Sequence, residues 1–430
     1  MVCTIDRTFR WFAGLALAAW LAGGAPAPAA ADDDVAPAAH VATDDDGPFH
    51  ASRLVRQLMR RRGGDPAAAA QLVQMVRPLP DDEGAEAFDI LAEAHRLAGH
   101  LNLAAETRRL LIEQFPEQPR AAAARLWLVR LYASSEVALA ARRAAGAETT
   151  GDADRGLATY AMHLADYQTE ATESAAPADG ALAFQRAAAA RRAGQIKIAE
   201  RTLTPLKHRR ADDPWAVCAR AEAWLADPRD KAPPKPAARC APAATPPQLD
   251  GVLDDACWQE NAPLSLASED DDDPAGVIRL AYDDEYLYFA VSCPQLSGAS
   301  YVRDLRPRAH DGAAPRHDLV RLRLDADRDY ATWFALAVDS RGWTADACWD
   351  DAAWNPAWYV AAAAPVDRPD AAWVVEAAIP WAELADVAPR AGDAWAVAID
   401  RQTPAADPQG WPASPAVAEG PQQFGLLLFE

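Results

Sequence analysis

The spacing of apolar residues changes once along the chain. Between about residues 51 and 228, Ala, Leu and other apolar residues recur at helical spacing, interrupted by Gly and Pro. Beyond about residue 248, apolar and polar residues alternate. Over 287–293 the odd positions are Leu, Phe, Val and Cys, and the even positions are Tyr, Ala and Ser. The pattern predicts a multidomain α + β protein, with a helical part followed by a β part.

The β part, residues 248–430, contains further alternating segments. They fall at 320–324, 333–338, 373–379 and 395–399. No long helical pattern lies between them, so we expect antiparallel pairing. Two packed sheets bury such segments best, which predicts an antiparallel β-sandwich.

The helical part, residues 51–228, shows a recurring Gly-x4-Ala spacing. It occurs at Gly64–Ala69, Gly99–Ala104 and Gly194–Ala199, and the first two copies start 35 residues apart. This region resembles tetratricopeptide proteins, whose repeat is about 34 residues long. The resemblance implies an array of paired helices that docks a protein partner. An ordinary helical bundle would have the same composition and stays open as an alternative.

Two segments before the helices predict export. Residues 1–31 have the features of a secretory signal: Arg7 and Arg10 precede an apolar run, and Ala29-Ala-Ala31 offers a small-residue cleavage site. Residues 32–50 are acidic and lack periodic apolar positions, so we expect a disordered tether. The protein should then be extracytoplasmic (periplasmic, cell-surface or secreted) with no membrane span after cleavage. An uncleaved membrane anchor is the alternative.

A proline-rich stretch separates the helical part from the β part. Seven prolines fall between Asp227 and Pro247. Such sequences favour extended, semi-rigid conformations. We therefore expect residues 229–247 to form an interdomain linker that few contacts cross.

Charge and cysteine content narrow the classes of partner. The net charge is −21, and residues 248–430 hold 12 Arg, no Lys and 32 Asp or Glu. Such a module repels phosphate backbones, which argues against a nucleic-acid partner; a solvated acidic surface explains the same charge. Cys3 lies in the expected signal. The other cysteines, whose pairing the sequence leaves open, are Cys218, Cys240, Cys257, Cys293 and Cys348.

The opening of the β part carries a family resemblance. Leu249-Asp250-Gly251 and Asp254-Asp255 precede Trp258, and a strand, an acidic turn and Tyr286-Leu-Tyr288 follow. This order resembles the family 9 carbohydrate-binding module, and Phe424-Gly-Leu-Leu-Leu-Phe429 resembles its ending. The resemblance implies a β-sandwich that binds a polysaccharide or oligosaccharide.

The sugar clamp of the family is not carried over. Well-understood sugar binders of this family hold a chain-end sugar between two tryptophans, beside a carboxylate and an Arg. The corresponding positions fall near Pro315, Ala418, Arg321 and Ala335, and none carries the family's residue. A glycan would therefore be bound at a different site.

Tryptophan is the residue type to consider for such a site, because a flat apolar face stacks on a pyranose. Ten of the fifteen tryptophans lie in the β part. Five of them occupy strand or family core positions and are expected to pack: Trp258, Trp333, Trp373, Trp381 and Trp395. The candidate sugar-stacking residues are Trp349 and Trp354, followed by Trp343, Trp358 and Trp411. A loop tryptophan that only covers a sheet edge is the alternative.

Acidic turns offer candidate oxygen ligands for calcium, which relatives of the family use structurally. They are Asp325, Asp327 and Asp329, and the run Asp270–Asp273. The first group lacks the glycine and the terminal glutamate of an EF-hand, since Leu336 stands at the position of that glutamate. Solvated acidic turns are the alternative.

No catalytic motif stands out. The chain has no G-x-S-x-G, H-E-x-x-H, P-loop or Rossmann glycine pattern. A weak transition-metal candidate is the pair His310-Asp311 and His317-Asp318. The β part has no Met for haem ligation, so no cofactor is expected beyond a structural calcium ion. Three functions stay open: an exported non-catalytic carbohydrate-binding protein, an envelope scaffold, and an accessory module or enzyme of glycoside hydrolysis.

Overall fold

A computed structural model describes residues 51–62, 65, 67–146, 151–171, 179–228, 232–268, 274–296, 301, 317–349, 351–363, 371–404, 406–413 and 420–430. The expected signal 1–31 and tether 32–50 lie outside these residues. Within them, no helix is both long enough and apolar enough to cross a membrane.

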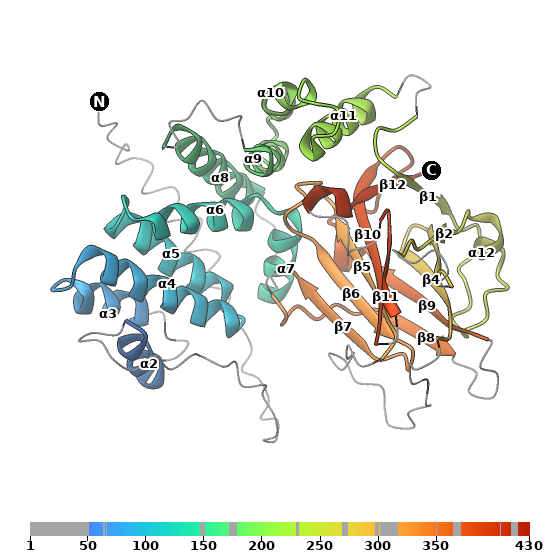
Figure 1. Cartoon of the computed structure of the whole chain (residues 1–430), viewed down its shortest axis with the longest axis horizontal. Coiled ribbons are helices and arrows are strands. Elements are labelled where there is room, and N and C mark those ends of the chain that lie inside the picture. The colour runs from blue at the N-terminus through green and yellow to red at the C-terminus, as the bar shows by residue number, and fades with distance from the viewer. Residues whose placement is uncertain are drawn as a thin grey trace.

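Helices occupy the described chain up to Ala226, as predicted (Figure 1). They are α2 (Ala51–Arg62), α3 (Ala67–Val76), α4 (Asp81–Leu97), α5 (Leu101–Gln114), α6 (Pro119–Ala133), α7 (Ser135–Ala145), α8 (Gly151–Ala171), α9 (Gly180–Arg192), α10 (Ile196–Lys207) and α11 (Pro214–Ala226). Two short helices, α12 (Ala256–Glu260) and α13 (Trp381–Leu384), and a 3-10 turn η1 (Gly420–Gln423) lie among the strands.

Glycine makes two of the helix–helix turns. Gly99 joins α4 to α5 and Gly194 joins α9 to α10, with φ of 73° and 74°. In this left-handed region a side chain is strained, so glycine favours these turns. Both glycines were singled out by the Gly-x4-Ala spacing. The structure thus has the paired helices of that pattern, while the tetratricopeptide assignment stays a prediction.

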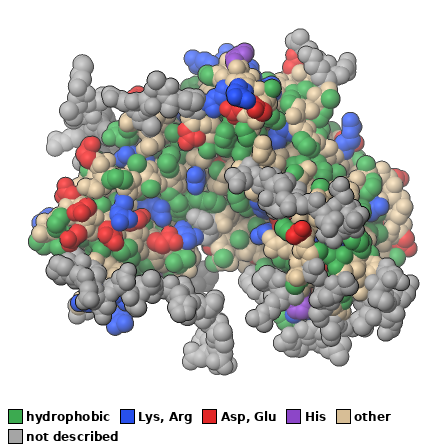
Figure 2. All heavy atoms as spheres, viewed as in Figure 1, with side chains coloured by type: hydrophobic (Ala, Val, Ile, Leu, Met, Phe, Trp, Pro, Cys, Tyr) green, Lys and Arg blue, Asp and Glu red, His purple; other side chains and the backbone are tan. Residues whose placement is uncertain are grey.

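The surface of the helical part mixes both signs of charge. In Figure 2, basic and acidic side chains are interspersed over the helices at the left of the view. Several charged side chains of the helical part pair, including Arg96 with Glu93 at 2.6 Å and Arg109 with Glu106 at 3.3 Å. Arg120 lies 3.4 Å from Asp89, linking α6 to α4. Exposed pairs such as Arg120 with Asp89 contribute little stability.

The strands form one curled sheet (Figure 1). They are β1 (Ala237–Pro242), β2 (Leu264–Ser265), β3 (Val277–Tyr282), β4 (Tyr286–Pro294), β5 (Leu319–Asp325), β6 (Phe334–Asp339), β7 (Thr344–Cys348), β8 (Tyr359–Ala363), β9 (Ala372–Pro380), β10 (Ala394–Thr403), β11 (Ala406–Trp411) and β12 (Gly425–Phe429). The order is β7-β6-β5-β10-β12-β1-β3-β4-β9-β8, with β11 beside β10 and β2 beside β3.

Strand β1 makes this sheet mixed, which corrects the expected all-antiparallel pairing. It lies between β12 and β3 and is parallel to both. Ala237 to Cys240 pair with Leu426 to Phe429, and Ala241 pairs with Ala281. The other pairings among the named strands are antiparallel. One strand therefore joins two groups of antiparallel strands.

The stretch expected to be a linker contains this central strand. Ala238 and Cys240 are buried, whereas Arg239 between them is exposed, as in a half-buried strand. Lys235, just before β1, is also buried, with 5% of its surface exposed. The expected linker therefore contains buried residues that pack between the helical part and the sheet.

Helices α5 to α11 share one hydrophobic core with the sheet, whereas α2, α3 and α4 pack in a second buried cluster. Phe184 of α9 and Trp215 of α11 pack around Tyr330 of the β5–β6 turn, with ring centroids 5.4 Å and 6.4 Å away. Tyr330 also contacts Phe424 of the β part at 6.1 Å. The same buried cluster extends through Leu131 of α6. Such continuity argues against two modules that move independently.

The motif that opens the β part is held by a buried glutamate. Glu376 of β9 accepts hydrogen bonds from the main-chain N–H of Asp250 at 3.0 Å and of Gly251 at 2.7 Å. Its other oxygen accepts from Nε1 of Trp258 at 2.8 Å. Gly251 has φ 83°, and a Cβ there would lie 2.8 Å from Cβ of Ala363. The expected packing role of Trp258 is confirmed, since its side chain is fully buried.

Burial also characterises the other core positions and the thiols. Trp373, Trp381 and Trp395 are buried as expected, whereas Trp333 is half-buried. The five described cysteines are free and buried: Cys218, Cys240, Cys257, Cys293 and Cys348. These cysteines therefore act as packed side chains rather than as cross-links in this structure.

Candidate functional site

Two of the candidate tryptophans, the first-choice Trp354 and the later candidate Trp358, lie inside the molecule. Trp354 is 8% exposed and stacks on Phe334 of β6, with ring centroids 4.7 Å apart. Trp358 is 6% exposed, and its Nε1 donates to Asp346 at 3.2 Å. Neither presents a free ring face, so neither is available to stack on a sugar in this structure.

Trp349 is half-buried and stands where the helices meet the sheet. Its ring lies 5.4 Å from that of Trp127 in α6, and the guanidinium of Arg108 covers Trp127 at 4.2 Å. Trp349 has φ 50°, a conformation that needs support from its surroundings. The stack of Arg108, Trp127 and Trp349 gives this residue a role at the helix–sheet contact.

Trp343 and Trp411 are half-buried. The guanidinium of Arg341 lies 3.9 Å over the ring of Trp343, which covers one of its faces. Trp411 ends β11 and pairs with Ile399 of β10, and its ring edge packs tightly over Gly425. The structure does not bring the five candidate tryptophans into one surface.

An exposed tyrosine surface lies elsewhere on the sheet. Tyr359 begins the edge strand β8 and is 55% exposed. Its ring meets that of Tyr286 in β4 edge to face at 6.2 Å, and Tyr286 lies 5.9 Å from Tyr288. Two exposed carboxylates, Asp284 and Glu285, directly precede Tyr286. Tyr288 is buried, so we call Tyr359, Tyr286, Asp284 and Glu285 the tyrosine surface.

The acidic turn after β5 folds into a compact loop. Asp325 and Asp329 are fully buried, and the main-chain N–H groups of Asp329 and Tyr330 donate to Asp325 at 3.2 Å and 2.8 Å. Arg328 and Tyr330 have φ of 57° and 56°. The three aspartates hold the first, third and fifth positions of this loop. Tyr330 is at the sixth position and has the left-handed conformation that glycine adopts at this position of an EF-hand.

A fourth carboxylate reaches this loop from the helical part. Glu136, in the first turn of α7, is 1% exposed and accepts from the main-chain N–H of Ala326 at 2.5 Å. Its other oxygen accepts from the hydroxyl of Ser134 at 3.0 Å. One oxygen each of Glu136, Asp325 and Asp327 lies within 4.8 Å of the other two. We call Glu136, Asp325, Asp327 and Asp329 the carboxylate site.

Burial and mutual repulsion make charge costly at the carboxylate site. Burial, together with Asp327 and Asp329, raises the pKa of Glu136 well above its usual range. Burial and the neighbouring carboxylates do the same to the pKa of Asp325. Burial and then Asp327 raise the pKa of Asp329 to about 8. A bound cation would relieve the repulsion that these shifts report.

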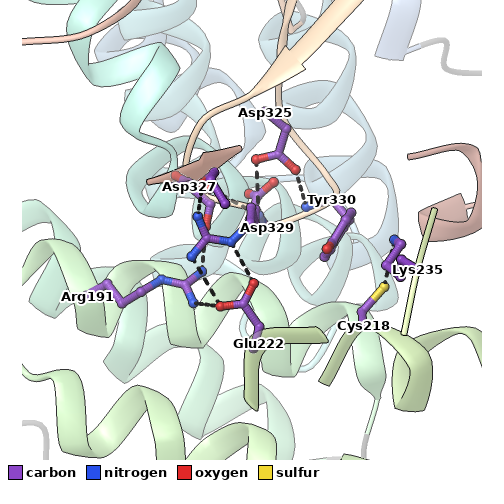
Figure 3. Close-up of polar contacts among 10 residues, drawn as sticks. Arg191, Cys218, Glu222, Lys235, Asp325, Asp327, Asp329 and Tyr330 are labelled. Atoms are coloured by element: carbon purple, nitrogen blue, oxygen red, sulfur yellow. Dashed lines mark hydrogen bonds and ion pairs between the residues drawn. The ribbon is translucent and has the colours of Figure 1, made fainter. Parts of the chain in front are cut away.

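The nearby arginines are directed to a different acid (Figure 3). Arg328 donates to Glu222 of α11 at 2.7 Å, and Arg191 of α9 donates to it at 3.1 Å. Arg191 also donates to the main-chain carbonyl of Asp327 at 2.5 Å. Burial alone would raise the pKa of Glu222, but the two arginines outweigh it and lower this pKa. Arg328 and Arg191 thus bridge the helices and the turn through Glu222.

The donor set of the carboxylate site fits a hard cation. Carboxylate oxygens from two elements are the ligands that calcium prefers, and the loop already has the backbone turn that such sites need. Magnesium also takes oxygen ligands but holds them in a tighter octahedron. The alternative acidic run Asp270–Asp273 lies outside the described residues.

Only His317-Asp318 of the histidine–aspartate pair lies within the described residues. His310-Asp311 lies outside them. Asp318 is fully buried and accepts from Arg401 at 2.5 Å and from Nε1 of Trp373 at 2.8 Å. The hydroxyl of Tyr301 donates to it at 2.8 Å. Asp318 therefore anchors a buried ion pair.

Sequence reasoning missed Glu136 and the tyrosine surface. Glu136 lies in the first turn of a helix, which favours acidic residues. No feature of the sequence indicates that it contacts a turn 190 residues away. Tyr286 and Tyr288 follow the period-2 pattern on one face of β4, and Tyr359 follows a tryptophan that was given more weight. An outward tyrosine on a strand was the available signal.

Comparisons with known proteins match less than half of the chain. No protein-family model matches the chain, and no curated protein matches it. Two solved structures of a carbohydrate binding module family 9 domain from Caldicellulosiruptor kristjanssonii are similar to part of it, one in complex with cellotriose and one with glucose. Each is 16% identical and covers 45% of this chain. The coverage of the module is 94% and 95%, with TM-scores of 0.34 and 0.31.

Proposed function

We propose that the protein is a non-catalytic carbohydrate-binding protein whose sheet binds a polysaccharide or oligosaccharide at the tyrosine surface. The observation that carries this proposal is the 55% exposure of Tyr359, whose ring is braced by Tyr286. An exposed, braced aromatic ring is the group that a pyranose face needs. The sequence resemblance of the β part to family 9 modules supports the same class of ligand.

The tyrosine surface offers the two kinds of contact that sugars need. The ring of Tyr359 supplies an apolar face, and the exposed carboxylates of Asp284 and Glu285 supply acceptors for hydroxyl groups. Stacking on one ring contributes on the order of 1 kcal/mol beyond area burial. Affinity should therefore be weak, roughly micromolar to millimolar.

Binding of the full chain to a glycan array, followed by calorimetry with the best ligand, tests the proposal. Tyr359→Ala should weaken binding about tenfold or more, with an unchanged unfolding temperature, because the ring is largely exposed. Tyr167→Ala is a matched control, since Tyr167 is a 42% exposed tyrosine on α8. Equal binding by the wild type and Tyr359→Ala would contradict the assignment to this surface.

We further propose that the protein is exported and that its helices dock a protein partner. Export rests on the features of residues 1–31. The paired helices around Gly99 and Gly194 support a docking platform. Fractionation of cells that make the full chain tests the first point. Recovery in the cytoplasm with residues 1–31 intact would contradict it.

A specific observation favours a second function, that of a scaffold with a fixed helix–sheet angle. Glu136 of α7 completes the carboxylate site on the β5–β6 turn. We propose that calcium binds there, held by Glu136, Asp325, Asp327 and Asp329. Bound calcium would neutralise these acids and fix α7 to the sheet. The absence of any calcium-dependent change in stability would oppose this role.

A further inference from the structure

A lysine and a cysteine form a buried pair where the helices meet the central strand. Nζ of Lys235 lies 3.1 Å from Sγ of Cys218 (Figure 3). Cys218 belongs to α11 and is 1% exposed, while Lys235 is two residues before β1 and is 5% exposed. The pair therefore joins the last helix of the helical part to the strand at the centre of the sheet.

Three groups contact the buried amine of Lys235. Besides the thiol, Nζ contacts the main-chain carbonyl of Pro421 at 2.9 Å and the ring face of Tyr330 at 4.2 Å. These contacts include no carboxylate. Burial lowers the pKa of Lys235. An amine that releases its proton more readily than usual is a better nucleophile.

Lysine at this place contrasts with the rest of the chain. The sequence has 4 lysines and 38 arginines, so arginine is its ordinary cation. A guanidinium keeps its proton in proteins, whereas an amine can lose it and attack an electrophile. Lys235, whose amine contacts Cys218, is thus the type of cation that can react with an oxidised thiol.

We propose that Cys218 and Lys235 are a site of reversible oxidative cross-linking, in which a peroxide converts them into a sulfenamide. In the first step Sγ attacks hydrogen peroxide, the O–O bond breaks, and the thiol becomes a sulfenic acid with release of water. In the second step the Nζ lone pair attacks this sulfur, the S–O bond breaks, and a second water leaves. Sulfur is oxidised by two electrons, the peroxide is reduced, and the side chains together lose two hydrogen atoms.

The segment that carries Lys235 offers a way for the oxidant to enter. Its neighbours Pro234 and Pro236 are exposed, and the segment lies outside the strands. Segments with exposed backbone and few ladder hydrogen bonds open locally at low cost. Withdrawal of Lys235 would uncover Cys218. After oxidation, the S–N bond would hold this segment on α11.

Peptide mass spectrometry of the full chain after peroxide treatment at pH 8 tests the proposal. Trypsin should release peptide 211–220 with Cys218 and peptide 232–239 with Lys235, because cleavage between Lys235 and Pro236 is disfavoured. We expect the two peptides to be joined, with a mass two hydrogen atoms below their sum. Excess dithiothreitol should separate them again.

Two variants and an internal reference make the result decisive. Lys235→Arg keeps the charge and removes the amine, so it should yield an oxidised Cys218 without a cross-link. Cys293→Ser is the matched thiol control and should leave the cross-link intact. Sulfoxide at the half-buried Met59 reports that the dose was effective. Unlinked peptides at that dose would overturn the proposal, as would a cross-link that retains the peroxide oxygen.

Discussion

Glu136 accepts a main-chain hydrogen bond from the residue before Asp327, and Asp327 accepts one from the residue before Glu136. Glu136 accepts from the N–H of Ala326 at 2.5 Å, and Asp327 accepts from the N–H of Ser135 at 2.8 Å. This reciprocal contact brings two acids together across the helix–sheet boundary. The loops around them are thereby fixed while their charges repel.

Calcium should stabilise the protein more at high pH than at low pH. The folded-state pKa values of Glu136, Asp325 and Asp329 lie above their unfolded values, so the folded protein binds more protons. Without calcium, stability should therefore fall as the pH rises from about 4 to about 8. Calcium replaces the protons, so millimolar calcium should raise the unfolding temperature by a few degrees at pH 8 and less at pH 5. Calorimetric scans at the two pH values measure this, and an equal shift at both would count against the site.

Glu136→Gln should separate charge from hydrogen bonding. The amide oxygen can still accept from Ala326, while one buried charge is removed. In calcium-free buffer at pH 8 the variant should be more stable than the wild type by roughly 1–3 kcal/mol. It should also lose most of its response to calcium. Denaturant unfolding with and without calcium gives both quantities, and the exposed Glu200→Gln is the control. Loss of stability in calcium-free buffer would show that the charge is favourable.

The place of β1 predicts which of two fragments of the β part behaves better in solution. A fragment of residues 248–430 lacks β1, so β12 and β3 would each have an unpaired edge. Exposed edges promote aggregation. Residues 232–430 restore the strand and should give a more soluble, more cooperatively unfolding protein. Size-exclusion chromatography and thermal unfolding of both fragments check this. Equal behaviour would mean that β1 is dispensable.

Glu376→Ala should destabilise the β part strongly. The change leaves the N–H groups of Asp250 and Gly251 and Nε1 of Trp258 without their acceptor, at a cost of about 3–5 kcal/mol. Glu376→Gln keeps acceptor capacity and should cost less. Denaturant unfolding of the two variants measures the difference, and a smaller loss for the alanine variant would contradict it.

Trp354→Ala should behave as a core substitution. Its ring is stacked on Phe334 and 8% exposed, so removal should cost about 3–5 kcal/mol. The same change at Tyr359, which is 55% exposed, should leave stability almost unchanged. Denaturant unfolding gives both values. A stable Trp354→Ala variant with lost sugar binding would restore the tryptophan to the ligand site.

Hydrophobic periodicity predicted the classes of element well. The 3.6-residue pattern located the helices up to Ala226, and the period-2 pattern located strands such as β4 and β10. Trp258 was recognised as an anchor from its place in the opening motif. These features depend on local spacing, which one sequence displays directly.

Long-range relationships were not predictable in the same way. Strand β1 has the sequence Ala-Ala-Arg-Cys-Ala-Pro, which lacks the branched and aromatic residues of a typical strand and follows several prolines. Its neighbours in the sheet, not its composition, make it a strand. Trp349 and Trp354 resembled loop residues because the cover over their rings comes from α6 and β6. Glu136 was likewise assigned to its site only by tertiary contact.

The pairing of β1 with β12 has a consequence for synthesis on the ribosome. β1 emerges before the other strands, but its partner β12 begins only at Gly425. The sheet can therefore close only after β12 has been synthesised. Until then, the nascent chain exposes unpaired strand edges, and chaperones would be needed to keep them apart. A ribosome that stalls before Gly425 would leave a product without β12, which quality-control proteases should remove.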